Sequence, residues 1–473
     1  MAAVNGTAPT ERRQRVAVIG GGPAGISALA AFQAAAAQGA RVPEVVLFDR
    51  QSEWGGTWNL PAATGLDEFG EVAHSAMYRH LWSNGPKECL ELPSFPFSAA
   101  FGPAPLPSYP PRDVLRRYLH LRAEHLGLAP HCRLRTAVRD VRCDGAMGRL
   151  ALTAHDLPAD RVYTEHFDFV IVATGHYSTP VLPEIPGLSR FRGRVLHAKA
   201  FCDAAQFAGS TILIVGASES AEDVGQQLLK FGAKRVVNSF RSTPLDYVLP
   251  QAWTQRPLLL KIEQDAGGAD VCHFADGTEE REIDAIVLCT GYRHHFPFLQ
   301  DELRLVTENR LWPQGLYKGT AWEKDPRVFY LGMQDQYFTF TFFEAQAWWA
   351  RDVILGVIKL PAAEAMAADS ERERAREEAC VTHGECIRFQ GAHLQTLLSA
   401  TDCPAVDVDA VCAIFEQWER DKRADFFGYR DRAHRSVVTG TMAAAPHRRW
   451  AEEMDDSAES FLASVPAPNL DAE

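Results

Sequence analysis

The sequence lacks three features that would mark a nucleic-acid-binding, membrane or secreted protein. Its 48 lysines and arginines are outnumbered by 61 aspartates and glutamates, a formal net charge of −13, so no basic face is expected for nucleic-acid phosphates. The longest apolar runs, such as 212–215 and 353–357, are far shorter than the roughly 20 residues of a membrane helix. Residues 1–14 are polar and lack the apolar stretch of a secretion signal. We therefore expect a cytoplasmic protein with neither nucleic acid nor membrane as a partner.

Paired cysteines are also missing. The ten cysteines are scattered along the chain, and no two of them stand in a CxxC pair. One cluster, Cys380-x-x-His383-x-x-Cys386, offers three ligands, one fewer than a structural zinc site needs. We expect a reduced chain that holds neither metal nor disulfides.

What the sequence does contain is a strand–turn–helix–strand unit near its start. The apolar run at 15–19 predicts a buried strand, and the alanine-rich stretch at 26–37 predicts a helix. A second apolar run at 44–48 predicts another strand, which ends at Asp49. This order of elements is typical of the first half of a nucleotide-binding fold.

The turn of this unit carries the pattern of a dinucleotide site. Gly20, Gly22 and Gly25 form GxGxxG, with Ala24 inside the turn. The first glycine permits the tight turn, the second lets the backbone approach a pyrophosphate, and the third lets the helix pack on the strand. Asp49 follows Gly25 at close to the roughly 20-residue spacing of a carboxylate that binds ribose hydroxyls. A glycine-rich turn without a ligand would not need this acid.

A second glycine pair follows directly after Asp49, in Trp54-Gly55-Gly56-Thr57-Trp58. Paired glycines let the backbone lie against a flat ring system, and Trp58 would form a wall beside it. A surface turn with a half-buried tryptophan is the alternative. Because the segment follows the ribose acid, we interpret Gly56, Thr57 and Trp58 as part of a flavin pocket.

The same order of elements recurs about two hundred residues later. The predicted elements are a strand at 211–215, a helix at 222–231 and a strand at 235–240. The turn reads Gly216-x-Ser218-x-x-Ala221, in which serine allows close approach and adds a hydroxyl donor for phosphate. The next strand ends at Arg241-Ser242, where an NAD-specific unit carries an acid, so we expect NADPH rather than NADH. A solvated arginine at a strand end is the alternative.

Two further strands, predicted at 167–173 and 283–289, end in matching Thr-Gly turns and flank the second unit. We interpret them as crossings between a discontinuous first domain and an inserted second one. The predicted fold class is α/β, with two Rossmann-type dinucleotide-binding domains and the NADP domain inserted in the FAD domain. The predicted ranges are 15–178 and 293–457 for the FAD domain, 179–292 for the NADP domain, and 1–14 and 458–473 for flexible ends.

A third motif resembles the identifying motif of flavin-containing monooxygenases. It reads Phe191-x-Gly193-x-x-x-His197-x-x-x-Phe201 and stands just ahead of the second glycine turn, as in that family. The resemblance covers roughly residues 15–455 and is closest to the bacterial trimethylamine monooxygenase branch. The segments that carry it are 55–58, 77–78, 81–88, 108–112, 288–292, 332–336, 338–340 and 345–349.

The resemblance implies an oxidoreductase in which NADPH reduces FAD and O2 then forms a C4a-hydroperoxyflavin. That adduct transfers one oxygen atom to an amine or sulfide, and the family often forms homodimers. Asn84 matches the family asparagine that hydrogen-bonds near flavin and nicotinamide, and Trp82 is expected to pack on the cofactor. By similarity, Gln51, Gln336 and Thr339 are placed at FAD, and Ser218, Ser220, Arg241 and Arg430 at NADP.

Several alternatives stay open on the sequence alone. His197 is either structural or catalytic. Phe201 stands where related ketone-oxygenating enzymes of the Baeyer–Villiger type carry tryptophan, which favours oxygenation of nitrogen or sulfur. A ketone oxygenase or an uncoupled NADPH oxidase is the alternative within this family. A pyridine-nucleotide-disulfide-type reductase is the alternative outside it, but it would need a redox cysteine pair.

Two predicted pocket residues depart from the trimethylamine branch. Glu219 stands where that branch has tyrosine, and Tyr337 replaces a tryptophan close to Asp335. An aromatic cage attracts an alkylammonium by about 0.5–2 kcal/mol for each good cation–π contact, so these changes weaken the cage. The extra carboxylate beside Asp335 suggests a larger or more polar amine than trimethylamine. It also raises the question of how well NADP+ is held.

Overall fold

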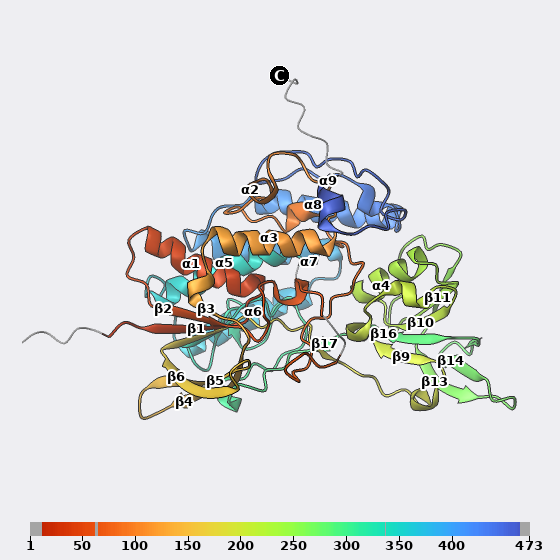
Figure 1. Ribbon diagram of the computed structural model, residues 1–473, viewed down its shortest axis with the longest axis horizontal. Helices are drawn as coiled ribbons and strands as arrows, with labels where there is room; N and C mark the ends of the chain where they lie inside the picture. The colour runs from red at the N-terminus through yellow and green to blue at the C-terminus, as the bar shows by residue number, and fades with distance from the viewer. Residues whose placement is uncertain (1–11, 62–64, 336, 464–473) are drawn as a thin grey trace, which may run out of the picture.

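The computed structural model describes residues 12–61, 65–335 and 337–463, and the chain forms two lobes around two separate sheets (Figure 1). The larger sheet is parallel from β20 through β3 and antiparallel at its β18–β19 edge. In spatial order its strands are β18 (Leu316–Tyr317), β19 (Ala321–Trp322), β20 (Val328–Tyr330), β7 (Phe169–Val172), β1 (Arg15–Ile19), β2 (Glu44–Phe48) and β3 (Cys132–Arg133). Val16 and Val18 of β1 are fully buried, as expected of a parallel sheet covered on both faces.

The second sheet lies in the other lobe and is parallel throughout. Its strands, in spatial order, are β12 (Trp253–Arg256), β11 (Arg235–Ser239), β10 (Thr211–Val215), β16 (Ala285–Leu288) and β9 (Arg194–His197). All five residues of β10 are buried, so the continuous apolar run of the sequence becomes the central strand. The two α/β units predicted from the glycine turns are therefore present.

A short ribbon lies where the chain passes between the lobes. β8 (Thr179–Pro180) pairs antiparallel with β17 (Tyr292–Arg293), so the outgoing and returning segments run side by side. Two antiparallel meanders complete the strands. They are β4 (Thr136–Asp144), β5 (Arg149–Asp156) and β6 (Arg161–Phe167), and β13 (Leu259–Gln264), β14 (Asp270–Phe274) and β15 (Glu279–Glu280).

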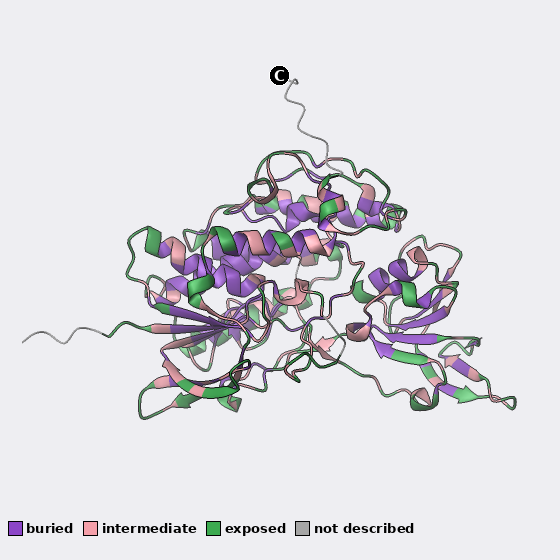
Figure 2. Cartoon of the chain, in the orientation of Figure 1, coloured by how far each residue is buried: buried purple, intermediate pink, exposed green. Residues whose placement is uncertain are grey.

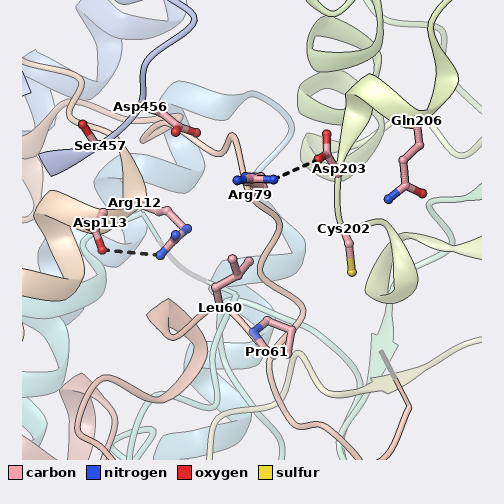
Figure 3. Close-up of a pocket in the computed structure, with 10 residues that line it drawn as sticks. All are labelled: Leu60, Pro61, Arg79, Arg112, Asp113, Cys202, Asp203, Gln206, Asp456 and Ser457. Atoms are coloured by element: carbon pink, nitrogen blue, oxygen red, sulfur yellow. Dashed lines mark ion pairs between the residues drawn. The ribbon is translucent and has the colours of Figure 1, made fainter. Parts of the chain in front are cut away.

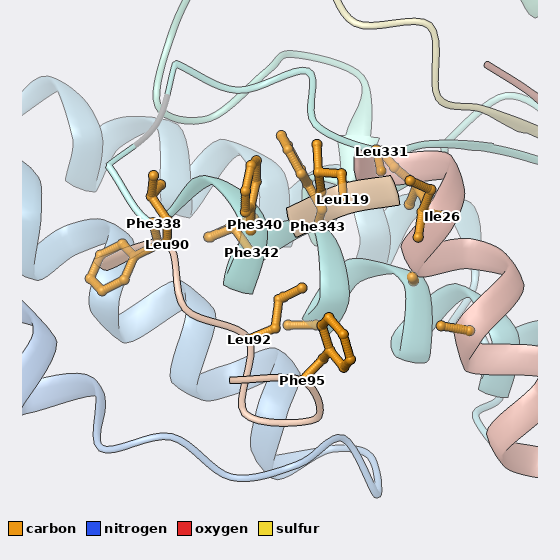
Figure 4. Packing of buried hydrophobic residues seen from close by; sticks show 14 of the residues in the cluster. Ile26, Leu90, Leu92, Phe95, Leu119, Leu331, Phe338, Phe340, Phe342 and Phe343 are labelled. Atoms are coloured by element: carbon orange, nitrogen blue, oxygen red, sulfur yellow. The ribbon is translucent and has the colours of Figure 1, made fainter. Parts of the chain in front are cut away.

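The helices cover the sheets and build the core of the larger lobe. They are α1 (Pro23–Ala37), α2 (Phe97–Phe101), α3 (Arg112–His125), α4 (Glu219–Lys230), α5 (Thr339–Ile354), α6 (Ala363–Glu378), α7 (His383–Ser399), α8 (Val408–Ala424) and α9 (Ala458–Ala463). Small side chains such as Ala28 and Ala31 let α1 pack closely along α5. Phe340, Phe342 and Phe343 of α5 extend this core, in which Figure 4 also shows Leu92 and Phe95.

Burial follows the two sheets and the α1–α5 pair (Figure 2). Trp348 and Trp349 of α5 are 3% and 4% exposed, so this aromatic pair belongs to the core rather than to an open surface. By contrast, α6 buries only Met366 and Ser370, as its charged sequence predicts. Among the described helices, none combines the length and apolar character needed to cross a bilayer.

The structure differs from the predicted elements at several boundaries. Helix α1 begins at Pro23, three residues before the predicted start, and the strands predicted at 167–173 and 283–289 are shorter. Helix α4 begins at Glu219, three residues before the predicted start, so the whole end of the second turn belongs to the helix. The flexible end predicted from residue 458 begins instead with helix α9. Its Phe461 is 5% exposed and packs edge-to-face on Trp82 at a ring distance of 5.7 Å. Burial of this ring and of Ala458 packs the helix on the larger lobe.

Candidate active site

The two glycine turns have the same backbone geometry. Gly20 follows β1 with a φ of +110°, and Gly216 follows β10 with a φ of +128°. A Cβ atom at Gly20 would lie 2.4 Å from the carbonyl oxygen of Ala173, and one at Gly216 would lie 2.2 Å from that of Cys289. Each of these carbonyls follows the neighbouring parallel strand, so no larger residue fits either turn.

The first turn forms an open cradle at the start of α1. A Cβ atom at Gly25 would lie 1.9 Å from the carbonyl oxygen of Gly20, so helix and turn are in direct contact. Gly56 lies against Gly22, where its Cβ would approach the Gly22 Cα atom to 2.8 Å. The N-cap residue Gly22 has no side chain to cap the helix, and the first turn contains no acid. Its backbone N–H groups are therefore suited to a pyrophosphate.

Asp49 ties this cradle to the end of β2. Its Oδ2 accepts a hydrogen bond from the backbone N–H of Gly21 at 2.5 Å, and its Oδ1 accepts one from Gln51 at 2.7 Å. Burial raises the pKa of the Asp49 carboxyl, although both backbone donors oppose that shift. The Gln51 side chain accepts a hydrogen bond from Asn59 at 2.7 Å. Asp49 thus lies beside the turn, as the spacing predicts.

Two aromatic residues predicted at FAD lie at different places, Trp58 against α5 and Trp82 against α9. Trp58 is half-buried and packs edge-to-face on Phe340 at 6.0 Å, one residue after Thr339 begins the helix. Trp82 is buried, and its indole N–H has no hydrogen-bond partner within the described residues. Such an orphaned donor fits a ligand with a nearby acceptor. Gln336, also predicted at FAD, lies outside the described residues.

The second turn presents hydroxyl groups. Ser218 is the N-cap of α4, yet its side chain makes no capping hydrogen bond, and Ser220 is exposed in the first helical turn. Arg241 and Ser242, which follow β11, are both exposed. Within the described residues the Arg241 guanidinium forms no recorded ion pair, so it is available for a phosphate.

Three polar residues from distant parts of the chain meet at the start of α4. The Nδ2 of Asn84 donates to the Oε2 of Glu219 at 3.4 Å. The phenol of Tyr177 donates to the Oδ1 of Asp335 at 3.3 Å. Asn84, Glu219 and Asp335 are all exposed side chains. The structure therefore brings two of the predicted pocket residues and the predicted catalytic amide into one polar region.

The carboxyl group of Glu219 is strongly perturbed. It retains solvent contact, but the surrounding protein raises its pKa to about 7, and the charges of Asp335, Glu222 and Glu419 act in the same direction. Lys422 opposes the shift. Near pH 7 Glu219 therefore exists in both protonation states.

The sequence was compared with known protein families and structures. Residues 13–255 and 265–416 match the family model described as flavin-binding monooxygenase-like. The chain belongs to this family. It is 50% identical to the trimethylamine monooxygenase of Methylocella silvestris over 94% of this chain and 98% of that protein. Identity to the trimethylamine monooxygenase of a Roseovarius species is 48%, over 95% and 99% of the two chains.

A solved structure gives the same result for the fold. The crystal structure of Tmm from a Pelagibacter species matches with a TM-score of 0.91 at 39% identity, and it covers 95% of this chain and 100% of that one. The present chain is thus a flavin-dependent monooxygenase, and its cofactors are FAD and NADPH. The cradle, the orphaned indole and the free hydroxyls and guanidinium described above fit two dinucleotides.

Arg430, predicted to bind NADP, is buried and paired with protein groups. Its side chain is 0% exposed. Its Nε donates to the carbonyl of Ser83 at 3.2 Å, its Nη1 donates to Gln226 at 2.5 Å, and its Nη2 donates to Asp223. Each of the three guanidinium nitrogens thus has a protein acceptor. The predicted contact of Arg430 with NADP stays a prediction.

The contacts of Arg430 belong to a larger interface between the lobes. The phenol of Tyr78 donates to Asp223, and Lys422 of α8 forms a buried ion pair with Glu222 of α4. The indole N–H of Trp418 donates to the backbone carbonyl of Asn84 at 2.8 Å. Arg430 and Trp418 thus hold the backbone on both sides of the Asn84 side chain. Sequence reasoning missed this interface, whose only local signal was the acid pair Glu222-Asp223.

His197 has a structural role. Its Nδ1 accepts a hydrogen bond from the backbone N–H of Lys199 at 3.0 Å, and its Nε2 donates to the carbonyl of Gly291 at 3.1 Å. Phe201 is 0% exposed and packs against Tyr78 and Phe207. The family motif therefore shapes the second lobe, and neither side chain is free to act on a substrate.

A cavity of about 570 Å³ opens at the junction of the lobes (Figure 3). It is lined by Leu60, Pro61, Arg79, Arg112, Asp113, Cys202, Asp203, Gln206, Asp456 and Ser457. Arg79 lies 3.7 Å from Asp203, and Arg112 lies at the same distance from Asp113. None of the predicted site residues lines this cavity. Within the described ranges no group of three or more His, Cys, Asp or Glu side chains is arranged to hold a metal ion.

The contact between Gly25 and Gly20 predicts that Gly25→Ala loses FAD. The added methyl group must displace the Gly20 carbonyl, so we expect FAD affinity to fall about tenfold or more, as measured by flavin fluorescence. Gly145→Ala is the matched control, because a Cβ atom there meets nothing within 4 Å. Equal FAD retention by both variants would contradict the close packing at the cradle.

The buried Arg430–Asp223 pair predicts a large loss of stability on breaking it. Arg430→Gln leaves a carboxylate buried without its counter-charge, which costs about 3–5 kcal/mol of unfolding free energy in urea titrations. Arg449→Gln removes a solvent-exposed pair with Asp431 and is expected to cost less than about 1 kcal/mol. The double variant Arg430→Met/Asp223→Leu should recover much of the loss. If Arg430→Gln and Arg449→Gln lowered the free energy of unfolding by similar amounts, the buried pair would not be what holds the lobes together.

Proposed function

We propose that this monooxygenase uses NADPH and O2 to insert one oxygen atom into a soft nitrogen or sulfur nucleophile. The substrate class is a tertiary amine such as trimethylamine, or a larger amine or sulfide. The observation that carries the proposal is the exposed Asn84 amide, held between the lobes next to Glu219. The similarity to trimethylamine monooxygenases over nearly the whole chain supports the same chemistry.

The proposal assigns each lobe a cofactor. Residues 15–178 and 293–457 hold FAD through the Gly20–Gly25 turn, Asp49 and the 56–58 segment, and residues 179–292 hold NADPH through α4 and Arg241. When bound, FAD that has been reduced by NADPH supplies the activated oxygen atom. The chain's own part is to orient the substrate and exclude water, as is usual for cofactor enzymes. A homodimer is part of the proposal and is tested by light scattering.

Asn84 suits the role of a donor beside the reacting oxygen. Its amide donates a hydrogen bond but does not ionise, so it stabilises negative charge without delivering a proton. An aspartic acid at the same place would release a proton and favour loss of hydrogen peroxide. The backbone contacts of Ser83 and Asn84 keep the amide in place.

A second candidate, an NADPH oxidase that releases hydrogen peroxide, is favoured by one observation. The 3.4 Å contact to Glu219 occupies the amide donor of Asn84. If this contact persists with both cofactors bound, the amide is not available to the reacting oxygen. By contrast, the cysteine beside the second turn does not favour a disulfide reductase, because burial raises the pKa of the Cys289 thiol and keeps it protonated.

An NADPH-oxidation screen over amines, thioethers and a cyclic ketone tests the proposal. We expect trimethylamine, a bulkier tertiary amine or a thioether to stimulate NADPH oxidation and to yield a product one oxygen atom heavier by mass spectrometry. The cyclic ketone should give neither. If NADPH is oxidised without any oxygenated product, and hydrogen peroxide accounts for all the NADPH consumed, the protein is an NADPH oxidase and the proposal fails. If only the cyclic ketone is oxygenated, the protein is a ketone oxygenase.

The free guanidinium of Arg241 predicts the choice of coenzyme. Arg241→Ala removes charge-assisted hydrogen bonds to the 2′-phosphate, each contributing about 1.5–3 kcal/mol, so KM for NADPH should rise roughly 10- to 100-fold. KM for NADH, which lacks that phosphate, should change little. Arg281→Ala, which removes an exposed arginine paired with Asp265 in the same lobe, is the control. If Arg241→Ala raised KM equally for NADPH and NADH, the 2′-phosphate would have to bind at another residue.

A further inference from the structure

An amine substrate brings a proton that the reaction must remove. Alkylamines are protonated near neutral pH, and a protonated nitrogen has no lone pair to take an oxygen atom. A thioether has no such proton. An oxygenase for amines therefore gains from a proton acceptor close to the reacting position, whereas one for sulfides does not.

Glu219 is placed to be that acceptor. It is the first residue of α4, its side chain is exposed, and its Oε2 lies 3.4 Å from the Asn84 amide. Because the proposed function puts the reacting oxygen beside Asn84, a substrate nitrogen next to that oxygen also lies next to this carboxylate. The carboxylate is fixed by its helix, and α4 is fixed by the Arg430–Asp223 pair one turn further on.

The charges around Glu219 favour a cation. Asp335 faces it from the segment after β20, Glu222 from α4, and Glu419 from α8. Lys422 acts on it in the opposite direction, but that ammonium group already forms an ion pair with Glu222. His383 is likewise paired with Glu419, at 3.0 Å. Three carboxylates therefore act on Glu219 together with one ammonium group that is itself paired.

We propose that Glu219 accepts the proton of an alkylammonium substrate and thereby makes this monooxygenase selective for amines over thioethers. The inference rests on the proposed function. The proton passes from the substrate nitrogen to a carboxylate oxygen of Glu219, leaving a neutral carboxylic acid and a nitrogen lone pair. That lone pair then takes one oxygen atom of O2: the nitrogen–oxygen bond forms as the O–O bond breaks, and the second oxygen atom leaves as water, with NADPH supplying the two electrons. Glu219 returns its proton to solvent through its exposed face.

The raised pKa of Glu219, about 7, supports this role, because a base with a pKa near the working pH accepts and releases protons readily. Below pH 7 the carboxyl group is protonated and can neither attract the ammonium nor take its proton. Above pH 7 it is ionised. The value of kcat/KM for an amine should therefore rise up to about pH 7 and then level off.

The test compares wild type with Glu219→Gln, using trimethylamine and dimethyl sulfide between pH 6 and 9. We expect the amine-to-sulfide ratio of kcat/KM to fall at least tenfold in Glu219→Gln. The amine profile of the variant should no longer level off near pH 7, but rise about tenfold per pH unit with the fraction of free amine. Glu219→Asp should restore part of the ratio. Glu364→Gln, which changes an exposed glutamate in the first turn of α6, is the matched control.

A binding measurement gives a readout that does not depend on turnover. Tetramethylammonium carries the charge of the substrate but no proton and no lone pair, so it probes the cation site alone. Calorimetry with the holoenzyme should show tighter binding above pH 7 than below it, and Glu219→Gln should remove that pH dependence. The inference is overturned if Glu219→Gln leaves three quantities unchanged: the amine-to-sulfide ratio of kcat/KM, the pH profile for the amine and the binding of tetramethylammonium. That result would leave the proposed function intact. If wild type oxygenates neither substrate, it is the proposed function that fails.

Discussion

The buried ion pair between Arg430 and Asp223 fixes how the two lobes meet. One end of this contact lies on α4, one turn after Glu219, and the same guanidinium donates to the carbonyl of Ser83, next to Asn84. Asn84 and Glu219 therefore meet because their backbones are tied to one side chain. A buried guanidinium is costly unless its donors are satisfied, and here all three of its nitrogens have protein acceptors. The rings of Tyr429 and Trp450 also lie within 4.7 and 4.5 Å of it.

Other contacts strengthen the same interface between the lobes. Lys422 pairs with Glu222, and Tyr247 stacks on Phe426 at a ring distance of 4.6 Å. Separating the second lobe from α8 and the segment after it would expose two buried ion pairs together with this stacked surface. Preorganised polar groups act on a reaction without moving during it, and an interface held in this way meets that condition.

The sequence predicted those parts of the fold and site that depend on short spacings. The strands at 15–19 and 211–215, the glycine turns and Asp49 follow from local sterics, since the φ of Gly20 or Gly216 suits no other residue type. Helix α9 was missed, because what holds it is the burial of Phe461 on Trp82, a partner far away in the sequence. The protein partners of Arg430 were missed for the same reason, since Ser83, Gln226 and Asp223 are all distant in the sequence. The domain ranges and the cofactor residues, Arg430 among them, stay predictions.

The exchange of an aromatic residue for Glu219 changes the kind of recognition the pocket can perform. A cage of rings attracts an alkylammonium by cation–π contacts that do not vary with pH between 6 and 9. A carboxylate attracts the same cation only when ionised, and its neighbours move that ionisation to neutral pH. Tyr337 still offers a ring, with its phenol 3.5 Å from His383. In the proposed pocket this ring would be an aromatic wall, while Glu219 would make the affinity for a cation depend on pH.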